Sequence, residues 1–204
     1  NVARNLYLTL QLLDLGLPVV VALNLMDEAE RGGLAVEPAV LAKHLGVPVI
    51  PTVAIRGLGV DRAMAKAVET AEGVTSGGGR GPRYGRDVEE QIEALAAFLR
   101  AMQVELPFGL SPRAVAILLL ESDEEMLRWA EQQPQGSAIL AEARSAAAEI
   151  AERHGEPAPL RLARERHGLA GQIAQEAQAR VQARRSRQER LWRLTTAPLT
   201  GIPI

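Results

Sequence analysis

The chain contains no cysteine and few aromatic residues, and these shortages exclude several classes of function. Without cysteine there is no disulfide framework, no iron–sulfur cluster and no cysteine-ligated metal. Aromatic residues make up 3% of the 204 residues, so few side chains are available to stack on unpaired bases. The formal net charge of −2 also argues against a nucleic-acid partner. The sequence has no evident signal peptide, and no apolar run reaches the roughly 18 residues of a membrane-spanning helix.

A phosphate-binding loop is missing as well. The pattern Gly-x-x-x-x-Gly-Lys-Ser/Thr does not occur, so we expect no segment of this chain to wrap nucleotide phosphates. There is also no Asp-x-x-Gly segment to sense a γ-phosphate and its Mg²⁺. His44, His154 and His167 share no metal-ligand spacing, and we assign no catalytic residue and no metal site.

The most informative segment that is present is Asn24-Leu25-Met26-Asp27, directly after the apolar run 19–23. Such a run predicts a strand covered on both faces, and ligands in open α/β sheets bind just outside the carboxyl ends of strands. The Asp27 carboxylate can accept hydrogen bonds from guanine N1–H and N2, whereas adenine offers a lone pair at N1 and no amino group beside it. Asn24 would hold the loop and the purine edge. The same residues also suit a turn that merely closes a strand.

A second segment further along the chain favours the nucleotide interpretation. Residues 47–53 are predicted to form another strand, and its prolines favour an edge position in the sheet. Ala54, flanked by Val53 and Ile55, fits the small residue whose backbone N–H reaches guanine O6 in guanine-nucleotide proteins. A Gly-x-Gly turn follows at 57–59, although such glycines also suit an ordinary flexible turn into a helix.

Residues 1–72 alternate between predicted helices and strands, which indicates an α/β fold with a parallel sheet. After an opening helix, further helices are expected at 37–45 and 61–72, with Met64 and Val68 buried in the last one. A glycine-rich stretch at 73–85 predicts a linker. The remainder is predicted to be all-helical, with helices at about 86–104, 112–133, 136–154 and 168–193.

Several segments resemble the cytosolic amino-terminal region of the bacterial ferrous iron transport protein B family. The segments that carry the resemblance are 4–13, 15–16, 21–27, 45–51, 56–59 and 118–123. The run from Arg4 to Leu13 is not shared by GTPases generally, so it makes the resemblance specific. The likeness covers most of the chain, with gaps around 70–83 and 134–190.

The resemblance implies an organisation in four parts. Residues 1–72 would be the C-terminal half of a P-loop GTPase-type GTP-binding domain, and 73–85 the linker. Residues 86–193 would form a helical domain that acts like a GDP-dissociation inhibitor. Residues 194–204 would lead to a first transmembrane helix outside the chain, since the arginine-rich stretch before them is typical of a cytoplasmic membrane flank. That stretch also fits a solvated face of a long helix. On this interpretation the chain is a piece of a longer protein.

The family also implies ligands and partners. The guanine base of GTP or GDP would contact Asn24, Leu25, Met26, Asp27, Val53, Ala54 and Ile55. Mg²⁺ would be held by residues upstream of this chain, and ferrous iron would be the transported substrate. The intact protein would be a multi-pass GTPase of the bacterial inner membrane with this region on the cytoplasmic face. The resemblance also allows a homo-oligomer, and the chain alone is expected to be inactive because it lacks the phosphate loop.

Two other interpretations stay open at this stage. The chain could be a non-enzymatic helical interaction or regulatory module that carries a vestigial nucleotide-binding half. It could also belong to another P-loop GTPase, such as one used in ribosome assembly. The run at 4–13 and the arginine-rich end argue against the latter.

Overall fold

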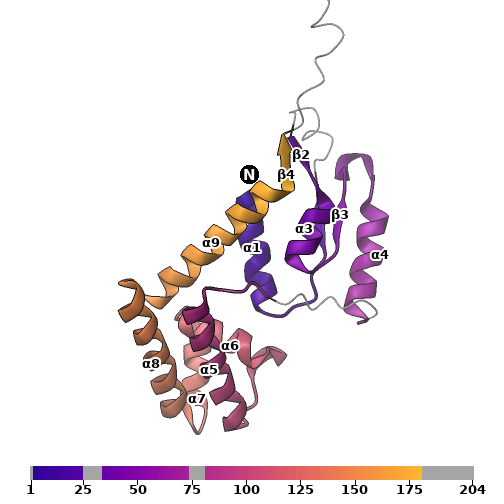
Figure 1. Ribbon diagram of the computed structural model, residues 1–204. Helices are drawn as coiled ribbons and strands as arrows, with labels where there is room; N and C mark the ends of the chain where they lie inside the picture. The colour runs from indigo at the N-terminus through magenta and orange to yellow at the C-terminus, as the bar shows by residue number, and fades with distance from the viewer. Residues whose placement is uncertain (1, 25–33, 74–80, 181–204) are drawn as a thin grey trace, which may run out of the picture.

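The computed structural model describes residues 2–24, 34–73 and 81–180, which form an α/β lobe and a helical lobe (Figure 1). The α/β lobe contains α1 (Val2–Asp14), β1 (Val21–Leu23), β2 (Leu34–Val36), α3 (Pro38–Leu45), β3 (Val49–Pro51), the 3-10 turn η1 (Ala54–Arg56) and α4 (Val60–Ala71). The helical lobe contains α5 (Arg86–Met102), the 3-10 turn η2 (Pro107–Gly109), α6 (Pro112–Leu120), α7 (Glu124–Gln132) and α8 (Gly136–His154). Helix α9 (Ala158–Ala177) runs from this lobe to α1, and β4 (Gln178–Arg180) follows it.

The predicted fold class is confirmed by the parallel pairing of β1 with β3. The register places Val21 opposite Val49 and Leu23 opposite Pro51. The connection between these strands passes through α3, as parallel pairing requires a crossover. Both strands therefore end at the same edge of the sheet.

Leucines at helical spacing fix α1 and α3 against the sheet. Leu6, Leu10 and Leu13 of α1 are buried in one core with Leu41 and Leu45 of α3. Local signals set the ends of α3, because a proline occupies its first turn and the glycine after it adopts a left-handed conformation. The alternating pattern of the first 72 residues thus folds as an open α/β layer.

The helical lobe differs from the prediction at its second helix. The predicted helix 112–133 is two helices, because Ser122 has a φ of 59° and breaks the backbone path between α6 and α7. Asp123 then begins α7 by accepting hydrogen bonds from the backbone N–H groups of Glu125 and Met126, both at 3.0 Å. A similar cap begins α6, where the Ser111 hydroxyl accepts from a backbone N–H at 3.1 Å.

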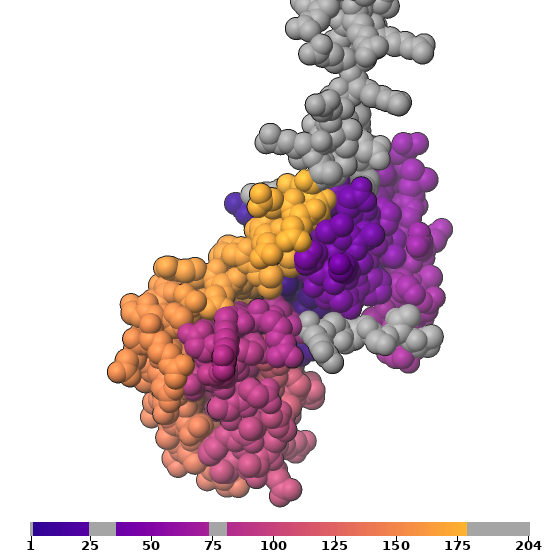
Figure 2. Space-filling model, in the orientation of Figure 1, coloured from indigo at the N-terminus to yellow at the C-terminus, as the bar shows by residue number. Residues whose placement is uncertain are grey.

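The last described segment also departs from the prediction of a helix at 168–193. Helix α9 begins ten residues earlier, at Ala158, behind Pro157, and ends at Ala177. Gln178–Arg180 is a strand that pairs antiparallel with β2, so the helical prediction is wrong there. The rest of that prediction, 181–193, and the segment 194–204 lie outside the described residues. Because α9 packs on α1 and α3, the two lobes touch through a helix that belongs to both (Figure 2).

The predicted burial of Met64 and Val68 in α4 is wrong. Their exposed fractions are 63% and 54%, and α4 lies on the outer side of β3 (Figure 1). Within the described residues, no helix makes an extensive contact with α4. The helical spacing identified the apolar face correctly but could not say what covers it.

Across the ranges 2–24, 34–73 and 81–180, none of the helices combines the length and the apolar character that a membrane span needs.

Candidate functional site

The candidate base site lies where β1 and β3 end together. The backbone N–H of Thr52 donates to the carbonyl of Leu23 at 2.8 Å, which continues the parallel ladder to the last residue before the Asn24 loop. The side-chain oxygen of Asn24 then accepts two hydrogen bonds from the other strand end. The donors are the backbone N–H of Ala54, at 3.0 Å, and the Thr52 hydroxyl, at 3.4 Å. One amide thus ties the two loops predicted to hold the base.

The loop after β3 has a fixed backbone shape. Val53 and Leu58 form an isolated antiparallel bridge, with N–H to carbonyl distances of 3.0 and 3.3 Å. Gly57 and Gly59 both adopt left-handed conformations, with φ of 68° and 77°. At Gly59 a Cβ atom would lie 2.3 Å from the carbonyl oxygen of Pro51, so only glycine fits this close approach. The predicted Gly-x-Gly turn therefore folds the loop back onto its own strand.

The structure brings together part of the predicted site. The backbone N–H of Ala54 donates to the side chain of Asn24, and Val53 is the residue just before Ala54 in the chain. Val53 is 8% exposed and faces the core, whereas Ile55 is 83% exposed and projects away from it. The remaining predicted base contacts, Leu25, Met26 and Asp27, lie outside the described residues.

Thr52 is a site residue that the sequence analysis did not identify. It is buried, with 5% of its surface exposed, and its hydroxyl reaches the side chain of Asn24. The available signal was a hydroxyl residue at the end of an otherwise apolar strand. A buried hydroxyl of this kind needs a partner, and Asn24 supplies it.

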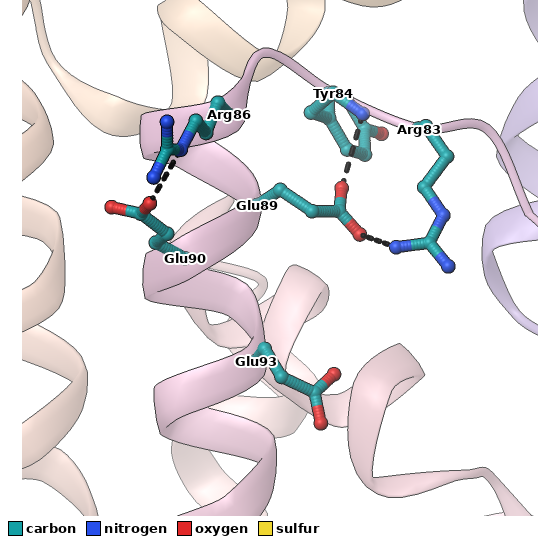
Figure 3. A pocket seen from close by; sticks show the side chains of 6 residues that line it. All are labelled: Arg83, Tyr84, Arg86, Glu89, Glu90 and Glu93. Carbon is teal, nitrogen blue, oxygen red and sulfur yellow. Dashed lines mark hydrogen bonds and ion pairs between the residues drawn. The ribbon is translucent and has the colours of Figure 1, made fainter.

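An open groove lined mostly by Arg and Glu side chains lies on the helical lobe (Figure 3). It lies beside the first turns of α5 and is lined by Arg83, Tyr84, Arg86, Glu89, Glu90 and Glu93. Glu89 is bound by Arg113, Arg83 and the backbone N–H of Tyr84. Arg86 holds Glu90 at 3.0 Å and Arg100 holds Glu93 at 2.6 Å. The carboxylates are already neutralised by arginines, so the groove is a surface ion-pair network.

The histidines take part in contacts between helices. His44 of α3 lies 2.8 Å from Glu176 of α9, and His154 at the end of α8 contacts Asp87 at the start of α5. His167 stacks on Tyr7 with ring centroids 4.2 Å apart. In the part of the chain that the structure describes, no group of three or more His, Cys, Asp or Glu side chains could hold a metal ion.

Two protein-family models match the chain. The model described as ferrous iron transport protein B matches residues 1–67, and the model described as the FeoB cytosolic helical domain matches residues 84–179. A fusion of Fe(2+) transport protein A with the Fe(2+) transporter FeoB, from Porphyromonas gingivalis, is 40% identical over 147 residues, which is 69% of this chain and 17% of that protein. The Fe(2+) transporter FeoB of Escherichia coli is 54% identical over 61 residues, which is 30% of this chain and 8% of that protein. The chain therefore spans less than a fifth of the length of these curated relatives.

Solved structures agree with these matches. A mutant of NFeoB from S. thermophilus bound to GDP has a TM-score of 0.74 and 29% identity, over 88% of this chain and 66% of that one. The cytosolic domain of T. maritima FeoB in apo form has a TM-score of 0.67 and 29% identity, over 88% of this chain and 64% of that one. Because the α/β lobe and the helical lobe each match a part of one family, this chain belongs to the ferrous iron transport protein B family.

Proposed function

We propose that this chain is the guanine-reading half of the GTP-binding domain, together with the helical domain, of a GTP-dependent ferrous iron transporter. The observation that carries the proposal is the hydrogen bond from the Ala54 N–H to the Asn24 side chain, which holds the two strand ends together. Both motifs thus converge at the carboxyl edge of a parallel sheet, where ligands of open α/β folds bind. The interpretation as another P-loop GTPase is set aside by the family matches.

The proposed base site draws on both loops and comprises Asn24, Leu25, Met26, Asp27, Val53, Ala54 and Ile55. Asp27 would accept hydrogen bonds from guanine N1–H and N2. The Ala54 N–H would donate to guanine O6, which would replace the Asn24 oxygen as its acceptor. Solved members of the family bound to GDP and to mGMPPNP support a guanine nucleotide as the ligand.

The surroundings of the sheet support a larger GTP-binding domain. Sheets of two strands are marginal without further partners, and the apolar face of α4 is exposed at Met64 and Val68. Upstream parts of the intact protein would cover this face, and would also supply the phosphate loop and the residues that hold Mg²⁺. Hydrolysis of GTP would need those parts.

The same proposal places the chain at a membrane. The intact transporter would move ferrous iron across the bacterial inner membrane, with this chain on the cytoplasmic face. The helical domain of residues 86–193 would regulate nucleotide retention, the segment 194–204 would lead to the first membrane span, and the protein could assemble as a homo-oligomer. The printed names of the curated relatives, which describe Fe(2+) transporters, support ferrous iron as the substrate.

The base assignment is tested by Asp27→Asn in the intact transporter. The variant loses the carboxylate that would accept two hydrogen bonds from guanine, and bonds to a charged group contribute about 1.5–3 kcal/mol each. We expect GDP affinity to fall by about 10²- to 10⁴-fold. Affinity for xanthosine diphosphate should rise, because an amide can donate to the xanthine O2. Calorimetric titration with both nucleotides measures the two changes.

Glu28→Gln is the matched control, since it removes the same charge one residue further along the chain. It should leave the affinities for both nucleotides within about twofold of the parent. An unchanged GDP affinity in Asp27→Asn, in a protein that folds and binds GDP, would contradict the base-reading role of this loop.

A further inference from the structure

A buried ion pair lies where the helical lobe meets α1. The guanidinium of Arg166, on α9, is 2.9 Å from the carboxylate of Asp14, the last residue of α1. Arg166 is 1% exposed and Asp14 is 4% exposed, so neither charge is solvated by bulk water. Charged side chains are almost never buried this fully unless they are paired, because the loss of hydration is large.

Hydrogen bonds extend this pair to four parts of the chain. The Tyr84 hydroxyl, just before α5, donates to Asp14 Oδ2 at 2.6 Å and accepts from Arg166 Nη2 at 2.8 Å. Arg166 Nη1 donates to Glu121, at the end of α6, at 2.8 Å, and to the Tyr7 hydroxyl of α1 at 3.4 Å. Helix α1, the approach to α5, the end of α6 and α9 therefore meet at one guanidinium.

The charges in this network depend on one another. Burial raises the pKa of Asp14 above its ordinary value, while the Tyr84 hydroxyl and Arg166 act in the opposite direction. Burial also works against the charge of Arg166, but Tyr84, Glu121 and Asp14 together raise the pKa of its guanidinium. Asp14 Oδ1 has no hydrogen-bond partner among the described residues. The carboxylate thus relies on donors at one oxygen, and a small shift of α9 or Tyr84 would leave a buried charge unpaired.

A network of this kind specifies position more than it adds stability. Apolar side chains of similar volume often stabilise an interior as well as a buried ion pair does. Apolar contacts also tolerate sliding, whereas these hydrogen bonds are all made in one arrangement of α1, α9 and the approach to α5. The network therefore holds α1, α9 and the approach to α5 in one relative position.

Two connections link this network to the candidate base site. Asp14 ends α1, and the chain then turns at Gly16 into β1 and reaches Asn24. Tyr84 lies on the segment that joins α4, the helix after the second base loop, to α5. The buried side of α1 also shares one core with Val49 of β3 and with the end of α9 around Ile173. A change in the position of α9 would therefore move α1 and β3, and with them the loops that follow β1 and β3.

We propose that Asp14, Tyr84 and Arg166 are positioning residues that couple the position of the helical lobe to the two base loops, which are the loops that follow β1 and β3. Breaking the hydrogen bonds of this network then speeds release of guanine nucleotide. This inference rests on the proposed function, because it takes the base site to be where the two loops meet.

Tyr84→Phe in the intact transporter tests the coupling with the least disturbance, because it removes only the hydroxyl. The release rate of a fluorescent GDP analogue, measured by stopped flow, should rise by about 2- to 12-fold, the equivalent of one net hydrogen bond. Arg166→Met removes the shared donor and should raise the rate further, within the roughly 5- to 150-fold range of allosteric couplings. A double variant should show non-additive changes, since both residues act through Asp14.

Two controls separate coupling from a general loss of stability. Ile150→Val lowers stability by trimming a side chain that is 1% exposed in the helical core, and it removes none of the hydrogen bonds of the network. Arg86→Gln removes an exposed ion pair with Glu90. Neither should change the GDP release rate by more than about twofold, even where the melting temperature falls.

Release rates in Tyr84→Phe and Arg166→Met within twofold of a GDP-binding parent would overturn the coupling while leaving the proposed function intact. A parent that binds no guanine nucleotide would instead refute the proposed function. In that case hydrogen exchange decides the coupling: faster exchange of the backbone amides at 49–59 in Tyr84→Phe than in Ile150→Val supports it, and equal exchange in the two variants overturns it.

Discussion

Gly59 is the position where one added methyl group should most directly disturb the second base loop. Its backbone has φ 77° and ψ −5°, and a Cβ atom there would lie 2.3 Å from the Pro51 carbonyl oxygen and 3.4 Å from Thr52 Cα. A non-glycine residue in the left-handed region costs roughly 1–2 kcal/mol. Relief of the contact needs a backbone shift, which adds about 1–3 kcal/mol. We expect Gly59→Ala to lower the free energy of unfolding by roughly 2–5 kcal/mol.

Gly57→Ala is a matched control for this change. Gly57 has a similar φ of 68°, but a Cβ atom there would meet nothing within 4 Å. Gly57→Ala should therefore lower the free energy of unfolding only by the cost of the left-handed backbone conformation, about 1–2 kcal/mol. Urea unfolding followed by circular dichroism measures both losses against the parent, provided that the denaturant slope stays constant.

The difference between the two variants isolates the contact with Pro51. Gly59→Ala should also weaken GDP binding more than Gly57→Ala does, because the shift occurs beside Thr52, which holds Asn24. Equal losses of stability in the two variants would refute the reasoning, since they would show that the close approach of Gly59 to β3 has no energetic consequence.

Two further predictions concern the helical lobe. Hydrogen bonds from its own backbone N–H and from His154 lower the pKa of Asp87 below its ordinary 3.8, although burial opposes them. This stabilisation is present above about pH 3.8 and is lost as the pH falls through the lower folded pKa. Asp87→Asn should therefore flatten the decline of stability below about pH 3.8, and parallel acid-unfolding curves of the variant and the parent would contradict this. Asp123→Ala should cost about 1 kcal/mol in urea unfolding by removing the cap of α7, and a loss no larger than that of the exposed Glu124→Ala would count against the cap.

The prediction of the α/β lobe succeeded where the signals were local. Apolar runs located β1 and β3, and leucine spacing located the buried face of α1. Pro38 and Gly46 marked the ends of α3 correctly, because a proline fits the first turn and a glycine accepts the left-handed end. Each of these features depends on residues within a few positions of one another.

The same reasoning failed where a distant partner decides. Met64 and Val68 have helical spacing, but the spacing does not reveal whether anything covers that face. The break at Ser122 is a backbone conformation that a non-glycine residue rarely adopts, so periodicity carried the predicted helix through it. Thr52 was missed because its role depends on Asn24, which follows another strand.

The sequence alone determined the alternation of α1, β1, α3, β3 and α4, the family and the two loops in which a guanine site is proposed, because these depend on short motifs and local periodicity. Only the tertiary structure decided that the Asn24 side chain bonds to Ala54 and that Arg166 is buried against Asp14. The latter pair is 152 residues apart, and an arginine on a helix has the same sequence signature whether it faces water or a buried carboxylate. The physical difference is the partner, and chain folding alone brings that partner into place.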